Sequence, residues 1–247
     1  MLRGGGGGGQ DAGSLSGLPL ADVQDLPADI LDQANEVTRE LAAAGIRISG
    51  ELTRAFAIYM GRLREWSRRM NLVSPRDLER VGRRHLLESF NVLTCPIDLA
   101  DGPLADAGSG AGFPGLPLAL VVPNLEVLLI ESVRKKALFL ERVITELGLA
   151  GRVQVRAARV EVLAASPELR GRFAVVTMRG FGLLSRGVRW CAPLLRPRGY
   201  LVAFKGTEFE KELRQAMAVM STSGLGLVDV VPLRWGEGRL VLLRRKD

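Results

Sequence analysis

A glycine-rich segment flanked by acidic residues carries the clearest chemical signal in the sequence. Asp106 ends an apolar run, and Gly108, Gly110 and Gly112 follow it. Glycine has no Cβ, so such a loop can turn sharply and bring backbone N–H groups close to a ligand. The next apolar run ends in Glu131, and an acid about 20 residues beyond a glycine loop is spaced to bind ribose hydroxyls. The pattern predicts a site for an adenosine-containing cofactor, although a tight strand–helix turn and a solvated acid would show the same residues.

The elements that must position this loop alternate between strand and helix from residue 103 onward. Apolar runs at 104–107, 127–130, 153–157, 173–178 and 200–204 are separated by segments with helical periodicity, such as 136–147. Alternation of this kind predicts βαβ units, in which a parallel sheet carries helices on both faces. Ligands bind at the carboxyl ends of the strands of such sheets, which is where the glycine loop begins.

The end of the chain predicts an antiparallel hairpin. The runs 225–233 and 239–243 are joined by residues 234–238, a connection too short for a crossover helix. A mostly parallel sheet closed in this way is similar to that of the S-adenosylmethionine-dependent methyltransferases. We therefore expect an α/β fold, the Rossmann-like class I S-adenosylmethionine methyltransferase fold, with a seven-stranded sheet. A nicotinamide oxidoreductase fits less well, since its sheet is fully parallel and the chain offers no proton-transfer dyad.

The N-terminal part predicts helices instead of strands. Leu52, Phe56, Tyr59, Leu63 and Trp66 recur every three or four positions, which indicates an amphipathic helix. Turn residues interrupt the pattern near 71–77, and a second amphipathic segment follows. We expect a disordered glycine-rich leader over 1–26, a helical segment packed on the core over 27–100, and an S-adenosylmethionine-binding methyltransferase domain over 101–247.

Composition narrows the classes of partner. The net charge of +7 favours an anionic partner, nucleic acid first, although the excess of arginine over lysine can also reflect genome base composition. The two cysteines lie far apart and the chain has a single histidine, which argues against a metal site or a disulfide framework. No apolar stretch is long enough to cross a bilayer and no secretory signal is present. We expect a cytoplasmic monomer without a metal.

Several separate motifs resemble those of the bacterial small-subunit ribosomal RNA methyltransferase G family, also called glucose-inhibited division protein B. They are the glycine loop 106–115 and the segments 71–77, 84–89, 132–136, 159–161, 178–180 and 204–206, in the family's order and spacing. Glu88 stands where the family has aspartate, and Met178 and Gly180 also depart from its pattern. The resemblance implies transfer of a methyl group from S-adenosylmethionine to N7 of one guanine in 16S ribosomal RNA, either as RNA or within the small ribosomal subunit.

The candidate site residues divide between cofactor and RNA. The glycine loop and its following acid, together with what the resemblance implies, give a cofactor set of Gly108, Gly110, Phe113, Glu131, Val160, Glu161 and Arg179. Cations in the first turn of a helix oppose its macrodipole. A basic cluster at that place is therefore unfavourable for the helix itself and indicates an anionic partner, the RNA backbone. Together with the further RNA candidates, the set is Arg84, His85, Arg134, Lys135, Lys136 and Lys205. No residue is expected to act as a general base, because guanine N7 carries no proton to remove.

Two other functions remain open from the sequence. One is a methyltransferase of the same fold that acts on a protein or a small molecule. Such an enzyme would have no RNA affinity, and its binding to its substrate would depend little on salt concentration. An RNA-binding module that has lost catalysis is the second, and the changes at Met178 and Gly180 are its only support.

Overall fold

The computed structural model describes residues 26–247, so the expected leader over 1–26 lies almost wholly outside the described residues. The helices are α1 Ala28–Ala43, α2 Gly50–Ser67, α3 Pro75–Leu78, α4 Gly115–Val121, α5 Arg134–Glu146, α6 Val160–Leu163, α7 Leu184–Cys191 and α8 Phe209–Thr222. The strands are β1 Leu104–Ala107, β2 Val127–Ile130, β3 Val153–Arg156, β4 Phe173–Met178, β5 Leu195–Lys205, β6 Leu225–Pro232 and β7 Arg239–Arg245. A π-helical segment, Gly82–Leu87, and short 3₁₀ turns connect α3 to β1.

The seven strands form one sheet in the order β3-β2-β1-β4-β5-β7-β6. The first five in sequence pair in parallel, whereas β7 runs antiparallel to both β5 and β6. This confirms the predicted class I methyltransferase sheet with its C-terminal hairpin. The alternation of strand and helix predicted the parallel part, because each parallel strand needs a crossover to reach its neighbour, and the short connection 234–238 predicted the antiparallel end.

Strand β5 begins earlier than its apolar run indicates. The run starts at Tyr200, but β5 begins at Leu195 and its pairing with β4 shifts register near its start. Arg198 has a φ of +63° at this irregularity. Pro197 and Gly199 hide the strand from a periodicity search, because both residue types are typical of turns.

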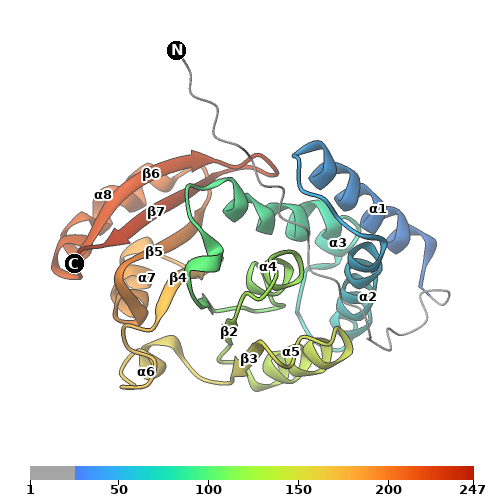
Figure 1. Cartoon of the computed structure of the whole chain (residues 1–247), viewed down its shortest axis with the longest axis horizontal. Coiled ribbons are helices and arrows are strands. Elements are labelled where there is room, and N and C mark those ends of the chain that lie inside the picture. Colours follow the sequence, from blue (N-terminus) through green and yellow to red (C-terminus); the bar gives the residue numbers. More distant parts are fainter. Residues whose placement is uncertain (1–25) are drawn as a thin grey trace, which may run out of the picture.

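Helices cover both faces of the sheet and divide the core in two. One buried cluster joins α1, α2, α4 and α5 to one face, and the other joins α6, α7 and α8 to the opposite face. Figure 1 shows α1 and α2 at one end of the molecule, and β6 and β7 extend from the opposite end toward α1. There Nε1 of Trp235, in the hairpin connection, donates to a carboxylate oxygen of Glu40 at 3.2 Å. Within residues 26–247 no helix has both the length and the apolarity that a membrane span requires.

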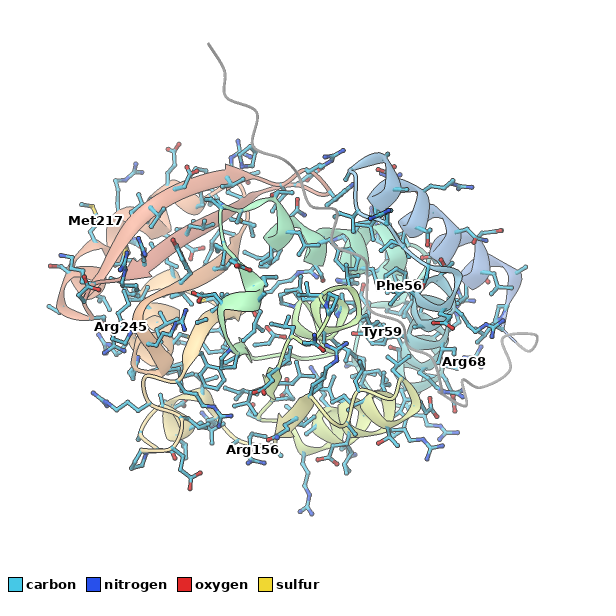
Figure 2. All side chains as sticks on the ribbon, in the orientation of Figure 1. Phe56, Tyr59, Arg68, Arg156, Met217 and Arg245 are labelled. Carbon is cyan, nitrogen blue, oxygen red and sulfur yellow. The ribbon has the colours of Figure 1, made fainter. Side chains whose placement is uncertain are left out.

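The N-terminal helices share the core of the sheet. Ser49 caps α2 by accepting a hydrogen bond from the backbone N–H of Leu52. Trp66 near the end of α2 packs against Phe139 of α5, with ring centroids 5.7 Å apart. In Figure 2 Tyr59, which belongs to α2, lies in the interior, whereas Met217 projects outward from α8. Because α2 is buried along this side, it can take part in the site at the edge of the sheet.

Candidate functional site

The carboxyl ends of three strands meet at one edge of the sheet. Ala107, the last residue of β1, pairs with Ile130 of β2 on one side and with Met178 of β4 on the other. The residues that follow these strands are the glycine loop, Glu131 and Arg179. Parallel register therefore brings three of the predicted site elements together.

The glycine loop takes a path that only glycine fits. Gly108, Gly110 and Gly112 have φ angles of +71°, +57° and +105°, a region that residues with a Cβ rarely adopt. A Cβ at Gly108 would lie 2.7 Å from the ring of Phe181, and one at Gly112 would lie 2.8 Å from the hydroxyl oxygen of Tyr59. At these glycine positions the wall of the site is therefore formed by backbone atoms without side chains.

A buried carboxylate lies beneath the loop. Asp106 accepts hydrogen bonds from the hydroxyl of Thr177, at 2.8 Å, and from the backbone N–H of Gly115, at 3.1 Å. Burial raises the pKa of Asp106 to about 6, and the bonds from Thr177 and Gly115 oppose that rise. From the sequence Asp106 is only the end of a strand. In the structure it joins β1, β4 and the first turn of α4.

Glu131 holds the glycine loop from the side. One carboxylate oxygen accepts from the backbone N–H of Gly110 at 2.8 Å, and the other accepts from Val133 at 2.7 Å. The side chain is buried. These bonds fix the loop to the end of β2 and to the start of α5. The predicted contact with ribose hydroxyls stays a prediction.

Val160 and Glu161 follow β3 and begin α6. Val160 is buried, and the half-buried Glu161 forms an ion pair with Arg159 at 3.7 Å. Neither they nor Glu131 belong to the walls of the cavity beside the glycine loop. The structure therefore places these three on the β2–β3 side of the loop and the remaining cofactor candidates around the cavity.

The cavity at the sheet edge measures about 530 Å³. Its walls come from the glycine loop, the π-helical segment and the ends of β4 and β5. Seven of the predicted residues line it, namely Gly108, Gly110, Phe113, Arg179, Arg84, His85 and Lys205. Cofactor and RNA candidates thus share one space, as a group-transfer reaction between two bound molecules requires.

Arg179 contacts several other polar residues on the charged side of the cavity. Its Nη2 lies 3.0 Å from both the carbonyl oxygen of Arg84 and Nδ1 of His85, and also contacts a carboxylate oxygen of Glu88, so its two N–H bonds are shared among three acceptors. Arg84 pairs with the same Glu88 oxygen. Burial lowers the pKa of Arg179, and the negative charge of Glu88 opposes this. Sequence reasoning missed Glu88 as a site residue, because nothing in its spacing says that it faces Arg179 across 91 residues.

His85 is held between Arg179 and an aromatic ring. Its imidazole stacks on Phe113, with centroids 5.0 Å apart and an interplanar angle of 20°. Burial, with a smaller contribution from the charge of Arg179, lowers the pKa of His85 to about 3. The imidazole is therefore neutral at physiological pH. Phe113 is buried beneath it and also lies 5.4 Å from the ring of Tyr59.

Lys205 lines the cavity with its ammonium already paired. Its Nζ donates to the carbonyl oxygen of Gly182 and, at 2.7 Å, to a carboxylate oxygen of Glu212. The side chain is 6% exposed, so it joins the loop after β4 to α8. Its predicted role toward RNA stays a prediction, and its present contacts fix the wall of the cavity.

The basic cluster at the start of α5 lies outside the cavity. Arg134 and Lys135 are exposed and Lys136 is half-buried. No acidic side chain within residues 26–247 forms an ion pair with any of them. Since α5 follows the β2 edge of the site, the cluster borders the predicted cofactor region.

The fold is that of the methyltransferases. A putative O-methyltransferase from Klebsiella pneumoniae superposes with a TM-score of 0.57 at 14% identity and covers 88% of this chain and 100% of its own. The mitomycin 7-O-methyltransferase MmcR gives 0.54 at 17% identity, with coverages of 84% and 82%. TYW2 of M. jannaschii, solved in complex with AdoMet, gives 0.51 at 17% identity, with coverages of 71% and 77%. At these identities the likeness defines the class of fold.

Sequence comparison defines the family. The family model for rRNA small subunit methyltransferase G matches residues 52–240. The ribosomal RNA small subunit methyltransferase G of Roseiflexus sp. is 40% identical over 193 residues, which are 77% of this chain and 81% of the relative. The enzyme of that name from Halorhodospira halophila is 42% identical over 187 residues, with coverages of 75% and 83%. The chain belongs to the rRNA small subunit methyltransferase G family, which confirms the resemblance stated from its motifs.

Proposed function

We propose that this protein transfers the methyl group of S-adenosylmethionine to N7 of one guanine in 16S ribosomal RNA. The observation that carries the proposal is one cavity, at the carboxyl edge of a methyltransferase sheet, where cofactor and RNA candidates meet in a chain of the rRNA methyltransferase G family. The protein's partner is the 16S RNA, either alone or in the small ribosomal subunit.

The residues at the cavity fit this cofactor. Gly108 and Gly110 offer bare backbone to it, and Nη1 of Arg179 is a buried donor without a partner. A guanidinium donor of this kind matches a carboxylate such as that of the methionine portion. Glu131, Val160 and Glu161 lie at the ends of β2 and β3, the place of the ribose and adenine in the proposal. Phe113, within the glycine loop, stacks on His85 at the wall of the cavity.

When bound, the cofactor supplies an activated methyl group on a sulfonium. The protein's task is placement, because N7 of guanine already has an in-plane lone pair and no proton to remove. The charged side chains of the cavity suit that role. His85 is neutral, and the carboxylates of Glu88 and Glu212 are paired with cations. Orientation of N7 in line with the methyl group is therefore the contribution to rate.

The remaining RNA candidates surround the reaction cavity. Arg84 lies at its mouth, with 43% of its side chain exposed, and Arg134, Lys135 and Lys136 form the basic cluster on α5. These cations neutralise backbone phosphates and so make binding weaken steeply with salt. Lys205 acts from the cavity wall.

Mapping of N7-methylguanine tests the proposal. Small-subunit RNA from cells with and without the gene is compared position by position, and purified protein with S-adenosylmethionine is then supplied to particles from the deletion strain. We expect one guanine to lose its methyl group on deletion and to regain it on addition of the protein. Identical RNA from both strains refutes the assignment.

A further inference from the structure

Two touching side chains of the cavity hold unpaired polar atoms. Nε2 of His85 and Nη1 of Arg179 are buried and have no hydrogen-bond partner. Within residues 26–247 only one other buried side-chain atom, Oγ of Ser67, is in this state. Buried polar atoms without partners are rare in folded proteins, and each needs an explanation. Two on adjacent residues that line one cavity point to ligand groups that complete them.

The hydrogen bond between these residues fixes which nitrogen of His85 carries the proton. Nη2 of Arg179 lies 3.0 Å from Nδ1 of His85. A guanidinium has donors only, so Nδ1 must accept. In a neutral imidazole the proton then lies on Nε2. The unpaired atom is therefore a donor, and it stays one across physiological pH because the pKa of His85 is lowered to about 3.

The backbone and ring of His85 are held in place. The residue lies on the π-helical segment Gly82–Leu87, and such segments are frequent at functional sites. The hydroxyl of Ser89 donates to the carbonyl oxygen of His85 at 2.6 Å. The ring also stacks on Phe113. A donor fixed in this way can distinguish groups that differ only in hydrogen-bond polarity.

We propose that His85 selects guanine, by donating from Nε2 to O6 of the target base while N7 faces the methyl group. The inference rests on the proposed function and deepens it. The edge of guanine that carries N7 presents O6 as a second acceptor, whereas adenine presents an amino donor at the same place. N7 must stay free to react, so O6 is the acceptor left for His85. Arg179 keeps its own free donor for the cofactor carboxylate.

Adenine is rejected by the same contact. Its amino group would face the N–H of His85, so two donors would meet and neither would have a partner. A site that leaves a buried donor unpaired discriminates by ~10- to 100-fold for one neutral hydrogen bond. Both purines have an unprotonated N7, so the lack of a proton at N7 does not by itself exclude adenine.

The test pairs a change in the base with two changes in the protein. Once the methylated guanine is mapped, small subunits are reconstituted with 16S RNA that carries 2-aminopurine at that position. This base keeps N7 and the 2-amino group but has hydrogen in place of O6. The protein variants are H85N, whose amide oxygen can still accept from Arg179 but which lacks a donor at the ε position, and H85Q, whose amide nitrogen reaches that position.

We expect the wild type to methylate the guanine particle with a kcat/KM ~10- to 100-fold higher than the 2-aminopurine particle. In H85N the guanine rate falls by a similar factor and the two particles become equivalent, whereas H85Q keeps most of the preference. Affinity for S-adenosylhomocysteine, measured by calorimetry, stays within about two-fold in both variants, which shows that Arg179 is still in place.

Two results overturn the assignment to His85. They are equal rates of the wild type on both particles, and an unchanged guanine preference in H85N. If H85N keeps the preference and H85Q loses it, His85 acts only by positioning Arg179. Failure of the wild type to methylate the guanine particle contradicts the proposed function itself, and the inference then fails with it.

Discussion

The substitution Tyr59→Phe isolates the link between the N-terminal helices and the glycine loop. The hydroxyl of Tyr59 donates to the carbonyl oxygen of Ala111 at 2.6 Å, and both residues are buried. Phenylalanine keeps the ring, including its contact with Phe113, and removes one oxygen. The carbonyl of Ala111 is then left without that partner inside the core.

The size of the effect follows from that lost partner. A buried acceptor without a hydrogen bond costs about 1–3 kcal/mol. For a chain of this length about 1 kcal/mol lowers the melting temperature by ~2–4 °C, so we expect a fall of roughly 2–12 °C. Ala111 lies between Gly110 and Gly112 in the loop that borders the cavity. A part of the cost should therefore appear as weaker cofactor binding, with about 1.4 kcal/mol giving a tenfold loss of affinity.

Thermal unfolding and calorimetry with S-adenosylhomocysteine measure the two effects. Tyr200→Phe is the matched control, since it removes the same oxygen from β5. The ring of Tyr200 lies 5.2 Å from the guanidinium of Arg244, and its hydroxyl has no hydrogen-bond partner among residues 26–247. We expect the control to match the wild type in both assays. If Tyr59→Phe also matches it, the argument that α2 holds the loop is wrong.

Three further changes probe the carboxylates and the basic cluster. Glu131→Ala removes the acceptor of the Gly110 and Val133 N–H groups. Affinity for S-adenosylhomocysteine should fall by ~10-fold or more, while RNA binding changes little. An affinity equal to that of the wild type would contradict the site assignment. Lys135→Glu together with Lys136→Glu should weaken binding to 30S particles in gel shifts and flatten its salt dependence by about one phosphate contact per lysine, with no change in cofactor affinity. The raised pKa of Asp106, about 6, means that the folded carboxyl keeps a proton that the unfolded chain has lost, so its contribution to stability declines as pH rises from 4 to 6. The melting temperature of the wild type relative to Asp106→Asn should fall over that range and level off above pH 7; a flat difference would show that Asp106 is ionised throughout.

The sequence was sufficient to predict those site residues that directly follow a predicted strand. Gly108 and Glu131 each follow a strand directly, and parallel register brings such ends to the same edge. Arg179 was predicted for the same reason. The partners of these residues were not accessible. Glu88 was visible only as a departure from a family pattern, yet it shares a carboxylate oxygen between Arg84 and Arg179.

The sequence by itself determined the mostly parallel α/β fold class, the loop that needs glycine and the antiparallel end of the sheet, because these depend on local periodicity and on the reach of short connections. The tertiary structure alone decided which charges remain available. From the sequence Lys205 is predicted to be a cation available to RNA, but in the structure its ammonium is paired with Glu212. His85 reads as a titratable residue, but burial and Arg179 keep it neutral. Both outcomes depend on contacts between separate elements, and desolvation by such contacts leaves no pattern in residue spacing.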